Sequence, residues 1–330
     1  MGQLVDGEWK TGELAPVEQG RFVRSQTRFR DRVSAEGRFP VEPGRYHLYA
    51  AAACPWASRA LVLRAVKGLE DAVGLTIVDP RMGPDGWSFE QYPGSDPDRL
   101  NGSRYLREIY VLADPHYTGR VTVPVLWDTR ERTIVNNESR ELMRMLDTQF
   151  DALARRRVTL LPEALREQVD ETITALYEPV NNGVYKAGFA RTQDAYAQAC
   201  RELFQALDHW ERVLSRQRYL CGDVLTEADV CLYTTLVRFE PVYYAHFKCN
   251  LSRLQDLPNL WNYLLDLYQT PGFAETTNLE HIKLHYYWSQ DGVNPTRIVP
   301  LGPRVDLTVA HDRDRLGPRK LAPLPETPTT

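Results

Sequence analysis

A single cysteine, Cys54, stands in the stretch YAAAACPWASR (49–59). It follows a short apolar run typical of a strand and precedes Pro55, a residue tolerated in the first turn of a helix. A thiol at a helix start faces unpaired amides and the positive end of the helix dipole, which favour the thiolate and predict a lowered pKa. The alternative is a buried structural cysteine. Because no second cysteine stands at Ala57, the reactive form predicts a mixed disulfide with a small external thiol.

Glu138 and Ser139 begin a second predicted helix in the stretch NNESRE. A helix start offers free amides to a carboxylate, and an acidic side chain can hold an amino group. Together they suit the γ-glutamyl end of glutathione, although an ordinary helix cap is the alternative. No metal site is predicted, because His281 and His285 are four residues apart but no third ligand follows at a suitable spacing.

The elements that must position these residues begin as strand, helix and strand, which predicts a parallel pair with a crossover helix. A loop-rich insertion with one helix near 103–113 follows. Two more strands, separated by a polar turn, predict an antiparallel hairpin, and a helix with acidic residues at its start comes next. This order is the thioredoxin-like layout, and the segments that form it are 45–53, 55–70, 73–80, 121–128, 132–137 and 138–150.

Pro124 lies in TVPVLW, just before the third strand of this layout. In thioredoxin-like proteins a cis-proline at this place presents the backbone of the preceding residue, here Val123, to a peptide-like thiol by β-type pairing. The sequence alone also allows an ordinary proline at a strand edge.

From about residue 160 onward the pattern is helical throughout, which predicts an all-α second domain. Tyrosines gather there, mostly as packing residues, and a minority can point hydroxyls into a cleft. We expect an N-terminal extension over 1–43, a thioredoxin-like domain over 44–152, an all-α domain over 153–288 and a tail over 289–330. The tail is rich in Pro, Arg and Asp and is predicted to be extended or disordered.

The overall composition narrows the class of protein. The formal net charge of −4 gives no bias toward nucleic acid or membranes, and no apolar run of about 18 residues predicts a membrane helix. The N-terminus lacks the basic start and apolar core of a signal peptide. Five cysteines at irregular spacings fit a reducing compartment, so a cytoplasmic location is expected.

Several motifs occur together in one order along about residues 20–303. They are YAAAACPWASR, GW at 86–87, GRVTVPVLWD, IVNNES, VNNGVYKAGFA and HYYWSQDGVNPTRIVPLGP. This set resembles the glutathionyl-hydroquinone reductases, the xi class of the glutathione transferase superfamily. The last two motifs distinguish that group from omega transferases, which share the Cys-Pro element. One departure is Ser58, where the family often has histidine.

The resemblance implies a thioredoxin-like domain plus an all-α domain, a homodimer, and reduction of quinol-thiol adducts with release of glutathione disulfide. It implies Cys54 as the nucleophile and Tyr185 as the proton donor, with the hydroxyls of Tyr243 and Tyr286 stabilising the thiolate. The glutathione contacts that it implies are Trp87, Arg120, Val123, Glu138 and Ser139.

Three alternatives stay open from the sequence. An omega-like thioltransferase or dehydroascorbate reductase would use the same cysteine. A non-catalytic scaffold could be built on the same fold. Finally, a source that uses another low-molecular-weight thiol would replace glutathione as the co-substrate.

Overall fold

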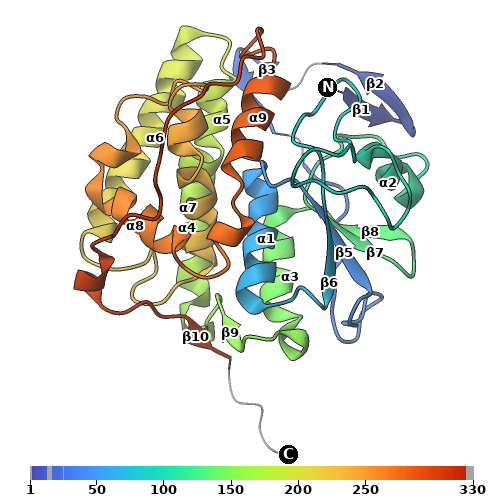
Figure 1. The fold of residues 1–330 in the computed structure, drawn as a ribbon, viewed down its shortest axis with the longest axis horizontal. Coiled ribbons are helices and arrows are strands. Elements are labelled where there is room, and N and C mark those ends of the chain that lie inside the picture. Colours follow the sequence, from blue (N-terminus) through green and yellow to red (C-terminus); the bar gives the residue numbers. More distant parts are fainter. Residues whose placement is uncertain (1, 13–16, 25, 325–330) are drawn as a thin grey trace, which may run out of the picture.

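The computed structural model describes residues 2–12, 17–24 and 26–324. A four-stranded sheet with helices on both sides forms one part, and a bundle of helices forms the other (Figure 1). Helices α1 (Pro55–Lys67) and α3 (Ser139–Thr148) lie between the sheet and the bundle, whereas α2 (Leu106–Ala113) lies on the far side of the sheet. An α/β part followed by an all-α part is therefore confirmed.

The sheet has the strand order β6-β5-β7-β8. Strand β5 (Tyr46–Ala50) runs parallel to β6 (Val73–Ile77), and α1 makes the crossover between them. On its other side β5 pairs antiparallel with β7 (Val125–Asp128), which forms a hairpin with β8 (Thr133–Asn136). The predicted parallel pair and the predicted hairpin are both confirmed. Because β5 is central, the residues that follow it emerge in the middle of one sheet edge.

The bundle contains two π-helical turns, η3 and η4, and each carries the tripeptide Glu-Pro-Val. Proline has no N–H to donate, which interrupts the regular helical hydrogen bonds and favours a widened turn. Tyr185 follows η3 closely, and Tyr243 is the last residue of η4. The elements of this part are η1 (Asp151–Leu153), β9 (Val158–Thr159), η2 (Glu163–Leu165), α4 (Arg166–Leu176), η3 (Tyr177–Asn181), α5 (Gly183–Gly188), α6 (Gln193–Leu214), α7 (Glu227–Leu236), η4 (Phe239–Tyr243), η5 (Leu254–Asp256), α8 (Pro258–Tyr268), η6 (Ala274–Thr276) and α9 (Leu279–Ser289).

The N-terminal segment forms two small hairpins, β1 (Gly2–Val5) with β2 (Glu8–Thr11) and β3 (Val17–Glu18) with β4 (Arg21–Phe22). Beyond these hairpins it runs to the sheet with little regular structure, as expected.

The tail after α9 is ordered as far as residue 324, and it crosses the bundle to the lower end of the molecule (Figure 1). It forms η7 (Arg313–Leu316) and β10 (Ala322–Pro323), which pairs with β9. Of the two predicted forms, extended or disordered, disorder is wrong for this stretch, which is a largely irregular chain held by specific contacts. A fully buried side chain, Arg313, fixes it by donating hydrogen bonds to the carbonyls of Leu214, Gln217 and Arg218.

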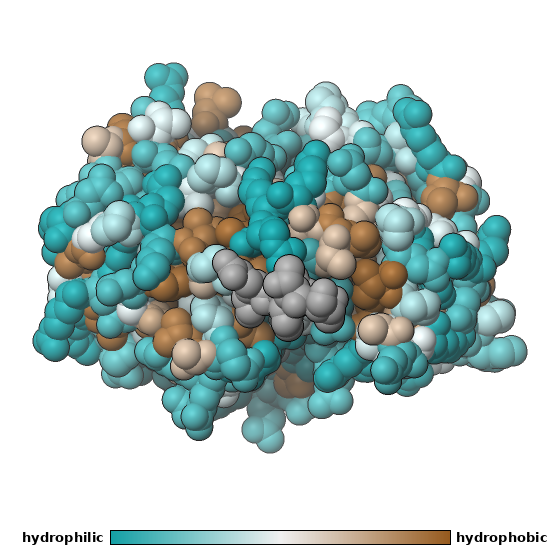
Figure 2. Space-filling model, turned by 90° about the horizontal axis from the view of Figure 1, so that it is seen from below, coloured by the Kyte–Doolittle hydropathy of each residue, from teal (hydrophilic) through white to brown (hydrophobic). Residues whose placement is uncertain are grey.

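The surface seen in Figure 2 is mostly hydrophilic, with apolar side chains visible in its central part. Within the part of the chain that the structure describes, none of the helices is both long and apolar enough to cross a bilayer.

Candidate active site

A cavity of about 400 Å³ opens beside the start of α1. Its wall combines the N-terminal segment, the first turns of α1 and α3, and the loop that leads into β7. Six of the predicted site residues line it together, although they are spread over more than 80 positions of the chain. They are Cys54, Trp87, Arg120, Val123, Glu138 and Ser139.

Cys54 is the residue that immediately precedes α1, and Pro55 occupies the first turn. Strand β5 ends at Ala50, a turn closed by a hydrogen bond from the Cys54 amide to the Ala51 carbonyl follows, and the extended backbone of Cys54 leads into the helix. The Sγ atom lies 3.8 Å from the carbonyl oxygen of Val123 and is half-buried at the cavity wall. The other four cysteines, Cys200, Cys221, Cys231 and Cys249, are buried as free thiols.

The pKa of the Cys54 thiol is raised, whereas the sequence predicted a lowered pKa. Burial raises the pKa of the thiol, while the amides of Ala57 and Trp56 and the guanidinium groups of Arg238 and Arg24 lower it in part. The helix start therefore acts as predicted, but desolvation outweighs it. Desolvation depends on tertiary packing around the sulfur, which the local sequence does not reveal.

The loop before β7 supplies the backbone wall of the cavity. The Val123–Pro124 peptide bond is cis, as in the thioredoxin-like layout. Tyr110 of α2 anchors this loop, because its hydroxyl donates to the Thr122 carbonyl at 2.8 Å. Burial lowers the pKa of Arg120, with a smaller effect of Arg24 in the same direction. Across the cavity, Trp87 is stacked on His285 at 4.6 Å between ring centroids.

The start of α3 forms the opposite wall. Glu138 caps this helix, its carboxylate accepting a hydrogen bond from the Arg140 amide and another from the Thr27 hydroxyl at 3.2 Å. Ser139 begins the helix, and its hydroxyl accepts a hydrogen bond from Arg59. The helix cap is therefore present, and the same two residues also line the cavity; their contact with glutathione stays a prediction.

The three predicted tyrosines form a separate, buried cluster behind the cavity. The hydroxyls of Tyr185 and Tyr243 are each hydrogen-bonded to that of Tyr286. Burial raises the pKa of all three, and the negative charge of Cys54 raises that of Tyr185 further. Among the described residues, none of these hydroxyls is hydrogen-bonded to the Cys54 sulfur. Of the two Tyr-Tyr pairs in the sequence, the first member of each joins the cluster.

Arg24 and Trp56 link the cavity to the tyrosine cluster, and sequence reasoning missed both. The Trp56 ring stacks on Tyr185 at 6.3 Å. The Arg24 guanidinium lies 4.6 Å from the Trp56 ring centre and 5.0 Å from that of Tyr185, and its Nε donates to Asn182. For Arg24, the only signal in the sequence was the alternation of arginine and aromatic residues in the stretch FVRSQTRFR (22–30).

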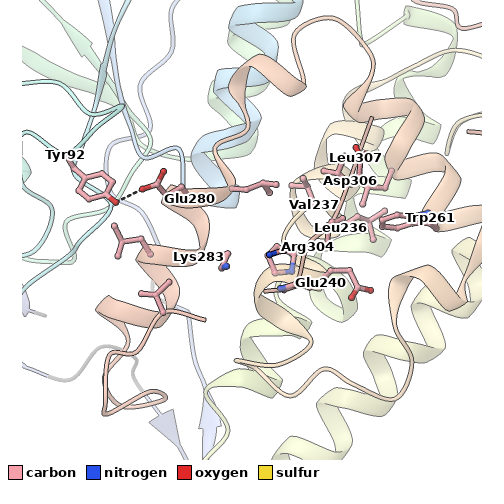
Figure 3. A pocket seen from close by; sticks show the side chains of 17 residues that line it. Tyr92, Leu236, Val237, Glu240, Trp261, Glu280, Lys283, Arg304, Asp306 and Leu307 are labelled. Carbon is pink, nitrogen blue, oxygen red and sulfur yellow. Dashed lines mark hydrogen bonds between the residues drawn. The ribbon is translucent and has the colours of Figure 1, made fainter. Parts of the chain in front are cut away.

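A second cavity, of about 680 Å³, lies against α7, α8 and α9 (Figure 3). Its lining is mainly apolar and includes Leu236, Trp261 and Leu307. At one side Tyr92 donates a hydrogen bond to Glu280 at 2.6 Å. No cysteine and none of the predicted site residues is among its described lining residues, so the chemistry is assigned to the first cavity.

Comparisons with known proteins agree with this geometry. Residues 53–149 match the family model of the glutathione S-transferase N-terminal domain, and residues 193–265 match that of its C-terminal domain. The chain is 48% identical to glutathionyl-hydroquinone reductase YqjG of Escherichia coli, covering 95% of this chain and 99% of the relative. It is also 48% identical to glutathionyl-hydroquinone reductase PcpF of Sphingobium chlorophenolicum, covering 92% and 96%.

Solved structures are similar over nearly the whole chain. A xi-class glutathione transferase from Natrialba magadii superposes with a TM-score of 0.91 at 53% identity, over 96% of this chain and 97% of that one. Glutathione-bound YqjG superposes with a TM-score of 0.88 at 46% identity, over 95% and 99%. This chain belongs to the xi class of the glutathione transferases, the glutathionyl-hydroquinone reductase family.

Proposed function

We propose that this protein reduces glutathionyl-hydroquinones to free hydroquinones, with glutathione as the second thiol. One observation carries the proposal: the half-buried Cys54 thiol lies at a helix start in a cavity that Trp87, Arg120, Val123, Glu138 and Ser139 also line. The relatives that bear this activity in their names match nearly the full chain and provide further support.

The reaction has two steps. The Cys54 thiolate attacks the sulfur of the adduct, the bond between this sulfur and the aromatic carbon breaks, and the carbon takes up a proton. Tyr185 is the proposed donor of that proton, since its raised pKa keeps it protonated at neutral pH. The thiol of a second glutathione then loses its proton, which restores the Tyr185 hydroxyl, and the resulting thiolate attacks the Cys54 mixed disulfide, releasing glutathione disulfide and restoring the Cys54 thiolate.

Glutathione would lie along the cavity wall. Its cysteine would pair with the Val123 backbone, and its γ-glutamyl end would meet Glu138 and the amides at the start of α3. Arg120 would hold a carboxylate of the tripeptide, and Trp87 would pack against its side. In this arrangement a single bound glutathione molecule contacts all five predicted residues, which are Trp87, Arg120, Val123, Glu138 and Ser139.

We assign supporting roles to Tyr243 and Tyr286. Tyr286 is hydrogen-bonded to Tyr185, and Tyr243 is hydrogen-bonded to Tyr286, so the proposed roles are to orient the Tyr185 hydroxyl and to help stabilise the thiolate. We also propose that the protein is a cytoplasmic homodimer. The proposed division of the chain is an extension over 1–43, a thioredoxin-like domain over 44–152, an all-α domain over 153–288 and a tail over 289–330.

Mass spectrometry of the purified protein tests the thiol and the site together. The expected result is a glutathione-mass adduct on Cys54 that a reductant removes. An adduct of another mass would replace glutathione with a different thiol.

Turnover of a glutathionyl-benzohydroquinone, compared with that of a glutathione mixed disulfide, tests the reaction. A preference for the quinol adduct is expected. A clear preference for the mixed disulfide would favour an omega-like thioltransferase, and no reduction with any thiol would favour a scaffold.

A further inference from the structure

We propose that Arg238 is a positioning residue of the nucleophile: it holds the chain on both sides of Cys54 and supplies a buried positive charge to the thiolate. This inference rests on Cys54 being the nucleophile of the proposed function. Neither the sequence motifs nor the family resemblance assigns Arg238 a role.

Arg238 reaches Cys54 from the other part of the molecule. It lies in the helical bundle between α7 and η4, and its side chain is 1% exposed. Its Nε donates to the Ala53 carbonyl at 2.9 Å, and Nη2 donates to the Ala52 carbonyl at 3.1 Å. These two carbonyls immediately precede Cys54, so the guanidinium fixes the turn from which the cysteine projects.

Arg238 also holds the chain after Cys54. Its Nη2 donates to the Ser58 hydroxyl at 2.7 Å, and that hydroxyl donates to the Cys54 carbonyl at 3.0 Å. Ser58 is the position where the family often has histidine, so this contact gives the departure from the family pattern a structural role. A planar guanidinium can make such divergent contacts at once, whereas a lysine ammonium cannot.

The charge of Arg238 has no acidic partner. Its remaining contact is a hydrogen bond from Nη1 to the Thr234 carbonyl at 2.7 Å, and among the described residues no carboxylate lies within ion-pair distance. An unpaired buried charge is costly unless an opposite charge is supplied. Arg238 lowers the pKa of Cys54, Tyr185, Tyr243 and Tyr286. Of these groups, a thiol is the easiest to ionise, so we assign the Cys54 thiolate, when it forms, as the counter-charge of Arg238.

Other groups around Cys54 also influence its charge. Arg24 lowers the thiol pKa from the N-terminal segment, and the amides of Ala57 and Trp56 do so from α1. Tyr185 of α5 interacts with the Cys54 charge, and Tyr243 and Tyr286 are joined to Tyr185 by hydrogen bonds among the hydroxyls. The remaining charged or titratable residues that line the cavity are Arg30, Arg120, Glu138 and Tyr177. Arg238 differs from the other cations because it is both fully buried and bonded to the cysteine turn.

The test measures the rate of Cys54 alkylation by iodoacetamide against pH, which requires no quinol substrate. Other cysteines are buried, and mass spectrometry assigns the site of labelling. For Arg238→Gln, which removes the charge and retains only one amide group as a hydrogen-bond donor, we expect the midpoint to rise by about one pH unit and the rate at pH 7 to fall about tenfold. Arg238→Lys, which keeps the charge, is expected to restore most of this rate while raising the KM for the quinol adduct.

Arg313→Gln is the matched control. Arg313 is equally buried and also binds three backbone carbonyls of the bundle, but these lie far along the chain from the cysteine turn. Its alkylation midpoint should equal that of the wild type. Equal midpoints for Arg238→Gln and Arg238→Lys, or a comparable shift in Arg313→Gln, would overturn the proposal.

A variant that leaves Arg238 in place covers the case in which Arg238→Gln fails to fold. Ser58→Ala removes one anchor of the guanidinium, and we expect an alkylation rate at pH 7 that is about twofold lower. An unchanged pH profile for Ser58→Ala would contradict the positioning role. If alkylation behaves as expected while quinol-adduct turnover is absent, Arg238 keeps its role and the proposed substrate is wrong.

Discussion

The cavity around Cys54 and the tyrosine cluster behind it use burial in opposite ways. The cavity is open, because a second thiol must reach the sulfur. The cluster is closed, with Tyr243 and Tyr286 at most 1% exposed. Burial raises the pKa of the tyrosines, which suits a group that must keep its proton until the carbon needs it. Burial also raises the pKa of the Cys54 thiol and so disfavours the thiolate, and the cations Arg24 and Arg238 offset part of this rise. The tyrosines need no such offset, because they act in the protonated form.

The largest expected effect distinguishes Cys54 from the other cysteines. Cys54→Ala should lower quinol-adduct reduction by about 10⁴-fold or more, because no other group can form the mixed disulfide. Cys231→Ala is the control, since Cys231 is fully buried in α7 and should affect stability rather than turnover per folded molecule. Steady-state rates of quinol-adduct reduction by the two variants test this prediction. Turnover that survives in Cys54→Ala would remove the cavity from the mechanism.

The next effect concerns the cluster alone. Tyr185→Phe removes the proposed proton donor and should lower kcat about 10²- to 10³-fold, with the KM for glutathione little changed. The rate of Cys54 alkylation should change little, because the cations and amides that favour the thiolate are unaltered. Tyr219→Phe is a clean control: Tyr219 is fully buried, and its hydroxyl has no hydrogen-bond partner among the described residues. An equal loss in both variants would mean that packing, rather than proton donation, is measured.

The cavity could be predicted from the sequence better than its electrostatics. Cys54, Val123 and Glu138 lie at element boundaries, where the strand and helix pattern fixes which backbone groups are free. The link through Arg24 and Arg238 could not be predicted, because the Arg24–Asn182 and Arg238–Ala53 contacts join residues more than 150 positions apart through specific side-chain directions. Arg238 was nevertheless visible as one cation within the apolar run VCLYTTLVRFEPV. The order in the tail depends similarly on one buried side chain, Arg313, which composition cannot identify.

His285 lies between the cavity and the tyrosine cluster, and its burial predicts that the free energy of unfolding depends on pH. His285 stacks on Trp87 of the cavity and contacts Tyr286 of the cluster edge-on. Burial lowers its pKa from about 6.5 to about 4. The neutral form is therefore favoured by folding, and the resulting stability is present above pH 6.5 and is lost as pH falls toward 4. At pH 5 the loss should be about 2 kcal/mol.

Urea unfolding between pH 7.5 and 5 measures this loss. His285→Gln should reduce the pH dependence of the free energy of unfolding. His246, whose pKa burial also lowers to about 4, accounts for a similar share. An unchanged slope in His285→Gln would mean that the ring is hydrated or moves out on protonation.

The smallest expected effect falls on glutathione binding at the start of α3. Glu138→Gln removes the charge that would hold the amino group of the γ-glutamyl end, and the KM for glutathione should rise about tenfold, as for the loss of one charged hydrogen bond. The kcat should change little, because neither Cys54 nor the tyrosine cluster is altered. Asp194→Asn is the control, since Asp194 is an exposed acid in the first turn of α6. A fall in kcat at unchanged KM would show that Glu138 acts on the reacting sulfur instead, and the cavity would then no longer divide into a binding end and a reacting end.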